Sequence, residues 1–308
     1  MRRLPQLLSA AAAVAALAAN GGGFSRRLDL LAHFTPIYAA MALAALALIG
    51  LAPGRRRRVA ALALVALAGS AVLIAPEFTR DAGPTAPTNA PGQIKVIQLN
   101  ALRTNTEIGK VADWLIAQHP DVVTLTETQP ELRELLVRRT GWAIAGIHSP
   151  LVIFTPRHYV VMNRPPTDEE EAPSFVNATY DSASGPMEVV TAHLDWPTEA
   201  YVAGQERTLA EILGQLPRRR TILTGDFNAA PWSAEMRRLD RASGLIRRDR
   251  ALPTWPAQVL GRRWPWPFVP IDHVYAGKGW ATVKVERGPW LGSDHYPVVV
   301  ILAPVAPP

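Results

Sequence analysis

The 308-residue chain contains no cysteine, so no disulfide bond can stabilise any part of it. A folded domain exposed outside a cell would have to rely on its hydrophobic core. The absence of cysteine also argues against a zinc site, because the sequence offers no closely spaced histidine pair that could bind zinc without thiolates.

Charged residues are also absent from three long apolar stretches near the N-terminus, at residues 4–19, 30–52 and 59–75. A helix needs about 20 apolar residues to cross a bilayer. We therefore predict a membrane anchor over residues 1–80 with about three transmembrane helices. The first stretch is short, rich in alanine and followed by glycines, so a cleaved signal peptide is an alternative for it.

The arginines indicate how the helices are oriented in the membrane. Arg55–Arg58 fill the short link between the second and third stretches, and basic loops favour the cytoplasmic side. Arg2 and Arg3 agree with this topology, whereas Arg26 and Arg27 do not. We expect a multi-pass protein of the inner membrane, with the part after residue 80 on the outer, periplasmic side.

The basic excess belongs to the membrane region. Residues 1–92 hold nine of the 32 basic residues and three of the 26 acidic ones, so the remainder of the chain holds 23 of each. A net charge of +6 therefore gives no support for nucleic-acid binding, which favours a basic soluble domain. Residues 81–92 are rich in Pro, Ala and Thr, which predicts a linker.

After the linker, the sequence predicts a strand at residues 94–99, a helix at 107–119 and a second strand at 121–126. The first strand ends at Asn100 and the second at Glu127. Because this order is typical of a β-α-β unit, both residues are expected along one edge of a sheet. Taken singly, each is also typical of a turn or a helix start.

More polar residues stand at strand ends later in the chain. The apolar run 221–223 is followed by Asp226 and Asn228, which project from the same side of an extended chain. The others are His193, Asp272, Asp294 and His295. Carboxylates that converge repel one another unless cations neutralise them, and oxygen ligands suit Mg²⁺ or Mn²⁺. For any one of these residues, a turn or structural role remains the alternative.

Residues 252–270 are unusual because they combine three tryptophans, five prolines and two adjacent arginines. Aromatic residues interleaved with basic ones can stack on nucleobases or lie in a lipid interface. The alternative is a long proline-stiffened loop whose indoles pack onto the core. The sequence does not decide among these.

Six short blocks are more specific together than any one of them. They are Gln98-Leu99-Asn100, Thr126-Glu127, Thr191-Ala192-His193, Thr224-Gly225-Asp226-Phe227-Asn228, Ile271-Asp272-His273 and Gly292-Ser293-Asp294-His295-Tyr296-Pro297. In this order, across residues 94–302, they resemble the endonuclease/exonuclease/phosphatase superfamily of DNase-like, metal-dependent phosphoesterases. One departure is Leu102, which stands where some members place a carboxylate near the metal.

The resemblance implies an α/β fold, a four-layer αββα sandwich of two packed mixed β-sheets, preceded here by transmembrane helices. It implies a catalytic domain over residues 93–305 that uses Mg²⁺ or Mn²⁺. It also implies that Glu127 is the main metal ligand, with Asn100 and Asp294 near the metal.

The same resemblance implies the catalytic roles. Asp226 and Asn228 would orient or deprotonate the attacking water and hold the phosphate. His193 would stabilise the developing phosphate charge, and His295, oriented by Asp272, would act as general acid or base. A carboxylate beside an imidazole does fix its tautomer and raise its pKa.

These expectations lead to a divalent-metal-dependent, nuclease-like phosphoesterase that hydrolyses phosphodiester or phosphomonoester bonds. One alternative is a membrane enzyme that cleaves phospholipid, sphingomyelin or phosphoinositide. An alternative of another class is an inactive membrane-tethered binding module. The expected partners are a phosphoester substrate, either nucleic acid or lipid, and the bilayer; no protein partner is evident.

Overall fold

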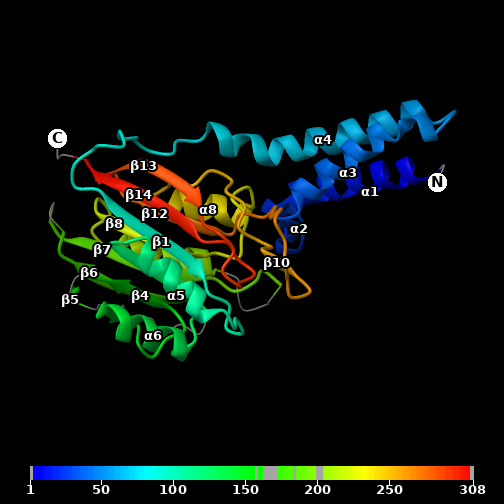
Figure 1. Ribbon diagram of the computed structural model, residues 1–308. Coiled ribbons are helices and arrows are strands. Elements are labelled where there is room, and N and C mark those ends of the chain that lie inside the picture. Colours follow the sequence, from blue (N-terminus) through cyan, green and yellow to red (C-terminus); the bar gives the residue numbers. More distant parts are fainter. Residues whose placement is uncertain (1–2, 157–158, 162–172, 183–184, 199–203, 306–308) are drawn as a thin grey trace. The chain divides into compact units, whose positions relative to one another are not determined.

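A computed structural model describes residues 3–156, 159–161, 173–182, 185–198 and 204–305 (Figure 1). The chain divides into two compact units. One comprises residues 1–80 with 229–237, and the other comprises residues 81–228 with 238–308.

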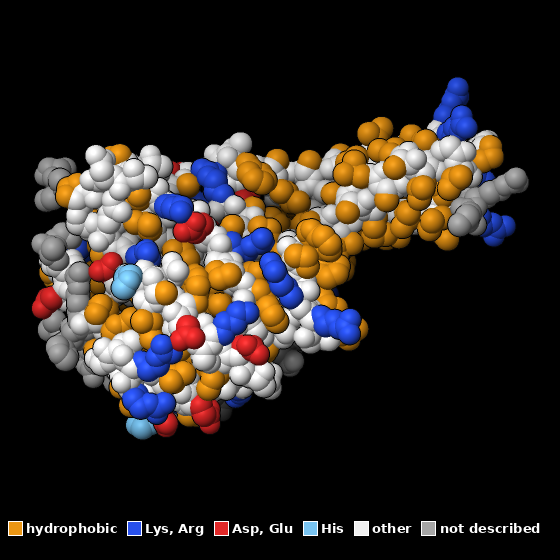
Figure 2. Space-filling view, viewed as in Figure 1, with side chains coloured by type: hydrophobic (Ala, Val, Ile, Leu, Met, Phe, Trp, Pro, Cys, Tyr) orange, Lys and Arg blue, Asp and Glu red, His pale blue; other side chains and the backbone are white. Residues whose placement is uncertain are grey.

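The first unit is helical. Its elements are α1 (Leu4–Ala19), η1 (Asn20–Gly23), α2 (Arg26–Ala32), α3 (Thr35–Ala47), η2 (Ile49–Leu51) and α4 (Arg56–Thr79). Fully buried alanines lie on three of the helices, among them Ala16 of α1, Ala45 of α3 and Ala66 of α4. Such small residues let helix backbones approach closely, as they do in membrane bundles. Figure 2 shows that hydrophobic side chains cover the outer surface of this helical unit.

Two segments, Leu4–Gly23 and Arg56–Thr79, are long and apolar enough to span a membrane. The second predicted span, at residues 30–52, is formed by two helices rather than one, and they are long and apolar enough to cross a membrane only when they are taken together. The chain there forms α2 and α3, which meet at an angle of 58°. Pro36 lies in the first turn of α3, where its missing N–H costs no helical hydrogen bond, so it starts a new helix rather than continuing α2.

The first unit also contains residues 229–237, which the sequence did not associate with the helices. Asp29 of α2 is buried and accepts hydrogen bonds from the backbone N–H groups of Ala234 and Glu235, at 2.7 and 3.0 Å. It therefore caps the first turn of α8 (Ala234–Ala242), where a negative charge is favourable. The indole N–H of Trp232 donates to the carbonyl of Ala32 at 2.7 Å.

The second unit contains two six-stranded sheets. The first has the order β13 (Trp280–Arg287), β14 (Val298–Pro304), β1 (Ile94–Asn100), β2 (Val122–Thr126), β4 (Val152–Thr155) and β3 (Ala143–Ala145). The second has the order β5 (Tyr159–Val161), β6 (Ser174–Tyr180), β7 (Met187–His193), β8 (Thr221–Asp226), β12 (Asp272–Ala276) and β9 (Ile246–Arg247). Each sheet is mixed, with one parallel pair, β1–β2 or β7–β8.

The sheets pack face to face around a core to which both contribute, including Val96 and Val300 from the first and Val189 and Ile222 from the second. On the outer face of the first sheet lie α5 (Ile108–Ala117) and α6 (Pro130–Thr140), in a second apolar cluster. The helix α7 (Gln205–Gly214) connects the parallel strands β7 and β8 and buries one apolar face. The predicted αββα sandwich is confirmed.

The segment at residues 252–270 contains a short hairpin of β10 (Gln258–Val259) and β11 (Arg262–Arg263). Neither of these two-residue strands was expected, because two residues are too few to produce a strand pattern in the sequence.

Candidate active site

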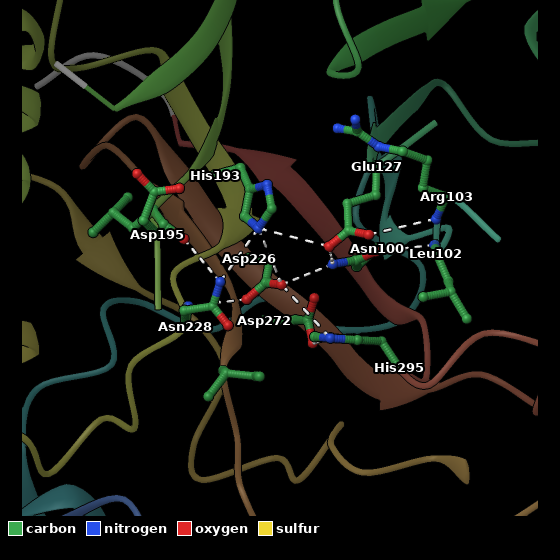
Figure 3. Close-up of polar contacts among 12 residues, drawn as sticks. Asn100, Leu102, Arg103, Glu127, His193, Asp195, Asp226, Asn228, Asp272 and His295 are labelled. Atoms are coloured by element: carbon green, nitrogen blue, oxygen red, sulfur yellow. Dashed lines mark hydrogen bonds and ion pairs between the residues drawn. The ribbon is translucent and has the colours of Figure 1, made fainter. Parts of the chain in front are cut away.

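The polar residues at the strand ends meet at one edge of the sandwich (Figure 3). Within each parallel pair, β1–β2 and β7–β8, the carboxyl ends point the same way. The sheet register places His193 opposite Asp226, and Asp226 opposite Asp272 on the antiparallel strand β12. Neighbouring strands thus bring together side chains that are far apart in the sequence.

His295 and Asp272 form a buried pair. Nδ1 of His295 lies 2.8 Å from Oδ2 of Asp272, and the other carboxylate oxygen accepts a hydrogen bond from Nε2 of Gln98 at 2.9 Å. This pairing makes Nδ1 the donor, so the ring is oriented with Nε2 toward Asp226 at 3.6 Å. The structure therefore places His295 and Asp272 as the sequence predicted.

Asp226 is the centre of the cluster and is only 1% exposed. Its Oδ2 accepts a hydrogen bond from Nδ2 of Asn100 at 2.9 Å, and its Oδ1 accepts one from the backbone N–H of Asn228 at 2.9 Å. Two histidine rings, those of His295 and His193, place Nε2 atoms 3.6 and 3.7 Å from Oδ2. A buried carboxylate is stabilised by such donors and cations.

Glu127 lies at the more exposed side of the site. Its Oε1 accepts a hydrogen bond from Nδ2 of Asn100 at 3.0 Å, and its Oε2 lies 3.4 Å from the backbone nitrogen of Arg103. The backbone of Glu127 has a φ of 51°, a left-handed conformation that is uncommon for a residue of this kind. Strain of this sort persists where the surrounding structure requires it, and it clusters at functional sites.

Asn228 and His193 form the opposite side. Nδ2 of Asn228 donates to the carbonyl of Leu194 at 2.8 Å and lies 3.3 Å from Nε2 of His193. Asn228 also has a positive φ, of 48°, which asparagine tolerates well. These contacts bring both residues to the site that the sequence predicted for them.

Asp294 is the member least connected to the others. Its Oδ1 is buried and has no hydrogen-bond partner among the described residues. No contact joins its carboxylate to Glu127 or Asn100 in the described part of the chain, although its charge acts on His295. The expectation that Asp294 lies near a metal thus stays a prediction.

The charges around His295 set its protonation. Burial lowers its pKa, but Asp272 and Asp226 together outweigh this effect and raise the pKa to about 10. At neutral pH the ring is therefore an imidazolium, and Nε2 carries a proton that faces the site.

The sequence profile of the Endonuclease/Exonuclease/phosphatase family matches residues 89–295, which is more than half of the chain. The chain belongs to the endonuclease/exonuclease/phosphatase family. Members of this family are hydrolases that act on phosphoester bonds. A search among curated proteins finds no match.

Solved structures of family members share the sandwich. An endonuclease/exonuclease/phosphatase from Beutenbergia cavernae is 21% identical, with a TM-score of 0.54 over 69% of this chain and 72% of that one. Danio rerio TDP2 complexed with single-strand DNA product is 17% identical, with a TM-score of 0.55 over 68% of this chain and 98% of that one. A mannosyl-6-phosphatase from Bacteroides thetaiotaomicron is 14% identical, with a TM-score of 0.55 over 68% and 99%.

The donor atoms of the site fit a divalent cation. In the structure, Nδ2 of Asn100 lies between a carboxylate oxygen of Glu127 and one of Asp226. These two oxygens would attract a positive charge at that position. A half-turn of the amide would place its oxygen there instead, at the cost of the hydrogen bond that the backbone N–H of Leu102 now donates to Oδ1 at 3.0 Å. A glutamate carboxylate and an amide oxygen are hard ligands of the kind that Mg²⁺ prefers.

A second group, Asp226, Asp272 and His295, also has ligand atoms within 4.8 Å of one another. However, Asp272 and Nδ1 of His295 already bind each other, and Gln98 takes the remaining oxygen of Asp272. We therefore interpret this trio as an ion-pair network, and Glu127 stays the predicted main ligand of a cation.

Sequence reasoning assigned no role to two residues that hold the site together. Gln98 precedes Asn100 by two positions in β1, so the alternation of a strand already placed both side chains on one face. Ser293 donates to the carbonyl of Asn100 at 2.7 Å and accepts from the backbone N–H of His295 at 3.0 Å. No sequence pattern indicates that cross-link, because 193 residues separate its ends.

Proposed function

We propose that the chain is a divalent-metal-dependent phosphoesterase that hydrolyses a phosphodiester or phosphomonoester by attack of water on phosphorus. The observation that carries the proposal is the continuous polar network from Glu127 through Asn100 and Asp226 to His295 and Asp272. It lies at the strand ends of a domain whose family acts on phosphoesters. An inactive binding module would have no physical need to hold these carboxylates together.

Glu127 and Asn100 would hold the cation, with Asp294 as a further candidate. When bound, Mg²⁺ or Mn²⁺ supplies a Lewis acid for a non-bridging phosphate oxygen. In the proposed reaction, Asp226 accepts a proton from the attacking water as the new P–O bond forms. The ester P–O bond breaks, and the leaving oxygen takes the Nε2 proton of His295.

The remaining residues orient His295 or stabilise the charge on the phosphate. Asp272 keeps Nδ1 of His295 protonated and so directs the reactive Nε2 toward the site. His193 and Asn228 place nitrogen donors on the other side of Asp226, where they would stabilise the charge that develops on the phosphate.

The substrate is a separate question from the reaction. One solved structure with the same fold is a complex with a single-strand DNA product and another is a mannosyl-6-phosphatase, so the fold alone does not determine the substrate. The neutral charge balance of residues 93–308 favours a lipid or a small phosphoester over nucleic acid.

The full chain in detergent or nanodiscs tests the proposed reaction. We expect hydrolysis of bis(p-nitrophenyl) phosphate with Mg²⁺ or Mn²⁺, loss of activity in EDTA, and recovery when the metal is added back. Activity that persists undiminished in EDTA contradicts the proposed metal dependence. A panel of DNA, RNA, sphingomyelin, phosphoinositide and sugar phosphate then identifies the substrate class.

We also propose that the catalytic domain lies on the periplasmic side of the inner membrane. The support is the run Arg55–Arg58 immediately before and within the start of α4, which favours the cytoplasm. External protease should digest the domain once the outer membrane is permeabilised, and protection of the domain in such cells would reverse the topology.

A further inference from the structure

Residues 259–266 form an uninterrupted exposed run, Val-Leu-Gly-Arg-Arg-Trp-Pro-Trp, at the tip and along one strand of the β10–β11 hairpin. Leu260 at the turn is 97% exposed, and Trp266 is 70% exposed. The structure therefore rules out the loop whose indoles all pack onto the core, because the largest apolar side chains of the run face solvent. In a soluble protein such a cluster marks an interaction site.

The charge of the run is of one sign. Arg262 and Arg263 are exposed between the aliphatic tip and the indoles, and residues 252–270 contain no Asp or Glu. Figure 2 shows basic and hydrophobic side chains together where the hairpin projects from the surface. The surface thus combines apolar side chains, whose burial away from water is favourable, with two cations, which are stabilised by nearby anions.

The hairpin is held firmly at its base. The hydroxyl of Tyr296 donates to the carbonyl of Trp264 at 2.9 Å, and the backbone N–H of Ala257 donates to the carbonyl of Asp294 at 2.6 Å. Trp264 also donates through its indole N–H to the carbonyl of Trp266, at 2.7 Å. The base of the hairpin is therefore bonded directly to the loop that carries Asp294 and His295.

We propose that this hairpin, residues 259–266, inserts into the surface of a lipid bilayer that contains anionic headgroups. Tryptophan is favoured at the interface between lipid and water, and arginine pairs with headgroup phosphates. Val259 and Leu260 decide against nucleic acid, because aliphatic side chains at the most exposed point offer no face on which bases stack. Two segments of the same chain are long and apolar enough to span a membrane, which favours a bilayer over other occupants of this surface.

The absence of cysteine makes a direct test possible. Leu260→Cys, at a position with no packing to lose, gives one site for an environment-sensitive fluorophore in the otherwise native full chain. Arg138→Cys, on the exposed side of α6, is the matched control. Both proteins are placed in nanodiscs of phosphatidylcholine with and without phosphatidylglycerol, and quenching by aqueous iodide is measured.

We expect the label at residue 260, but not that at 138, to shift to the blue in nanodiscs. Its iodide quenching in nanodiscs should be about tenfold weaker than that of the label at residue 138, the partition expected for one buried apolar group. Arg262→Gln with Arg263→Gln should weaken this protection in anionic nanodiscs. Equal quenching at both positions overturns the proposal, and so does a response to a single-stranded oligonucleotide but not to lipid.

One consequence rests on the proposed function: a substrate carried by a lipid headgroup would be presented at this hairpin. Leu260→Ser with Trp266→Ser should then lower hydrolysis of the lipid ester about tenfold or more, while hydrolysis of bis(p-nitrophenyl) phosphate is unchanged. Equal rates on the lipid ester contradict this consequence. Failure of the wild-type chain on both esters contradicts the proposed reaction instead, and leaves the fluorophore result to decide the membrane contact.

Discussion

Replacing Asp272 by Asn should lower the pKa of His295 and so change this proton donor while the surrounding fold stays in place. Asp272 is fully buried and lies 2.8 Å from Nδ1 of His295. Asparagine has nearly the same shape, and its Oδ1 can still accept the Nδ1 proton. The substitution removes one negative charge, and the amide of Gln98 must turn so that its oxygen accepts from the new NH2 group.

The size of the effect follows from the pKa of His295, which rises from 6.5 to about 10. At about 1.36 kcal/mol per unit, the folded protein favours the imidazolium by roughly 5 kcal/mol. Asp272 supplies the largest favourable share, with Asp226 next. We expect Asp272→Asn to lower the pKa by at least about one unit, or about 1.4 kcal/mol, and to reduce kcat by about tenfold.

The stability of the variant should depend on pH in a defined direction. A raised pKa in the folded state stabilises the protein fully below about 6.5, and that contribution is lost as the pH rises through about 10. The difference in unfolding free energy between wild type and Asp272→Asn should therefore be largest near pH 6 and shrink toward pH 10 and above.

The assay is an NMR titration of the histidine rings in the metal-free full chain, with the His295 signal assigned by its absence in His295→Gln. Asp113→Asn, which changes an exposed carboxylate paired with Arg139, is the matched control. An unchanged pKa of His295 in Asp272→Asn, together with unchanged kcat, would refute the reasoning.

Three further predictions concern the metal, the backbone and acid stability. Glu127→Gln should raise the Mg²⁺ concentration needed for half-maximal activity about tenfold or more, because a coordinating carboxylate loses its charge; an unchanged metal titration contradicts Glu127 as the main ligand. Gly225→Ala should lower the unfolding free energy by about 3 kcal/mol, since the added methyl would overlap the carbonyl of Ala192, whereas Gly109→Ala, with open space around it, should not destabilise. Burial alone would raise the pKa of Asp249, but His273 and Arg247 hold it at about 2. Asp249→Asn should therefore lower the unfolding free energy by about 2 kcal/mol at neutral pH, and this difference from wild type should shrink as the pH falls from about 4 toward 2. A difference that stays constant across this pH range in thermal unfolding contradicts the ion pair.

Much of the fold could be predicted because strand ends and polar residues coincide in the sequence. Apolar runs that stop at Asn100, His193 and Asp226 indicate where strands deliver side chains, and the structure confirms that these strands end there. The resemblance carried by the family blocks added the two packed sheets, which no single run indicates.

The parts that could not be predicted depend on contacts between distant residues. The sharing of one amide, that of Asn100, between Glu127 and Asp226 requires two sheets to meet, and nothing local to any of the three indicates it. The same holds for Asp29, whose carboxylate caps a helix 205 residues away. The sequence alone gave no indication of that contact.

The exposure of the hairpin could not be predicted from the sequence pattern of residues 252–270. Tryptophan, proline and arginine in residues 252–270 were compatible with a buried loop, a nucleobase platform or a lipid contact. The exposed fractions of Leu260 and Trp266 exclude the buried loop and leave the nucleobase platform and the lipid contact.

The most direct test of the central claim compares the wild-type chain with two variants, Asp226→Ala and His295→Ala, on one soluble phosphodiester at saturating Mg²⁺. Both residues are buried in the strand-end network, and both take part in the proposed proton transfers. We predict steady hydrolysis by the wild type and a loss of about 10²-fold or more in kcat for each variant, with both still folded by circular dichroism. Undiminished hydrolysis by either folded variant would contradict the site.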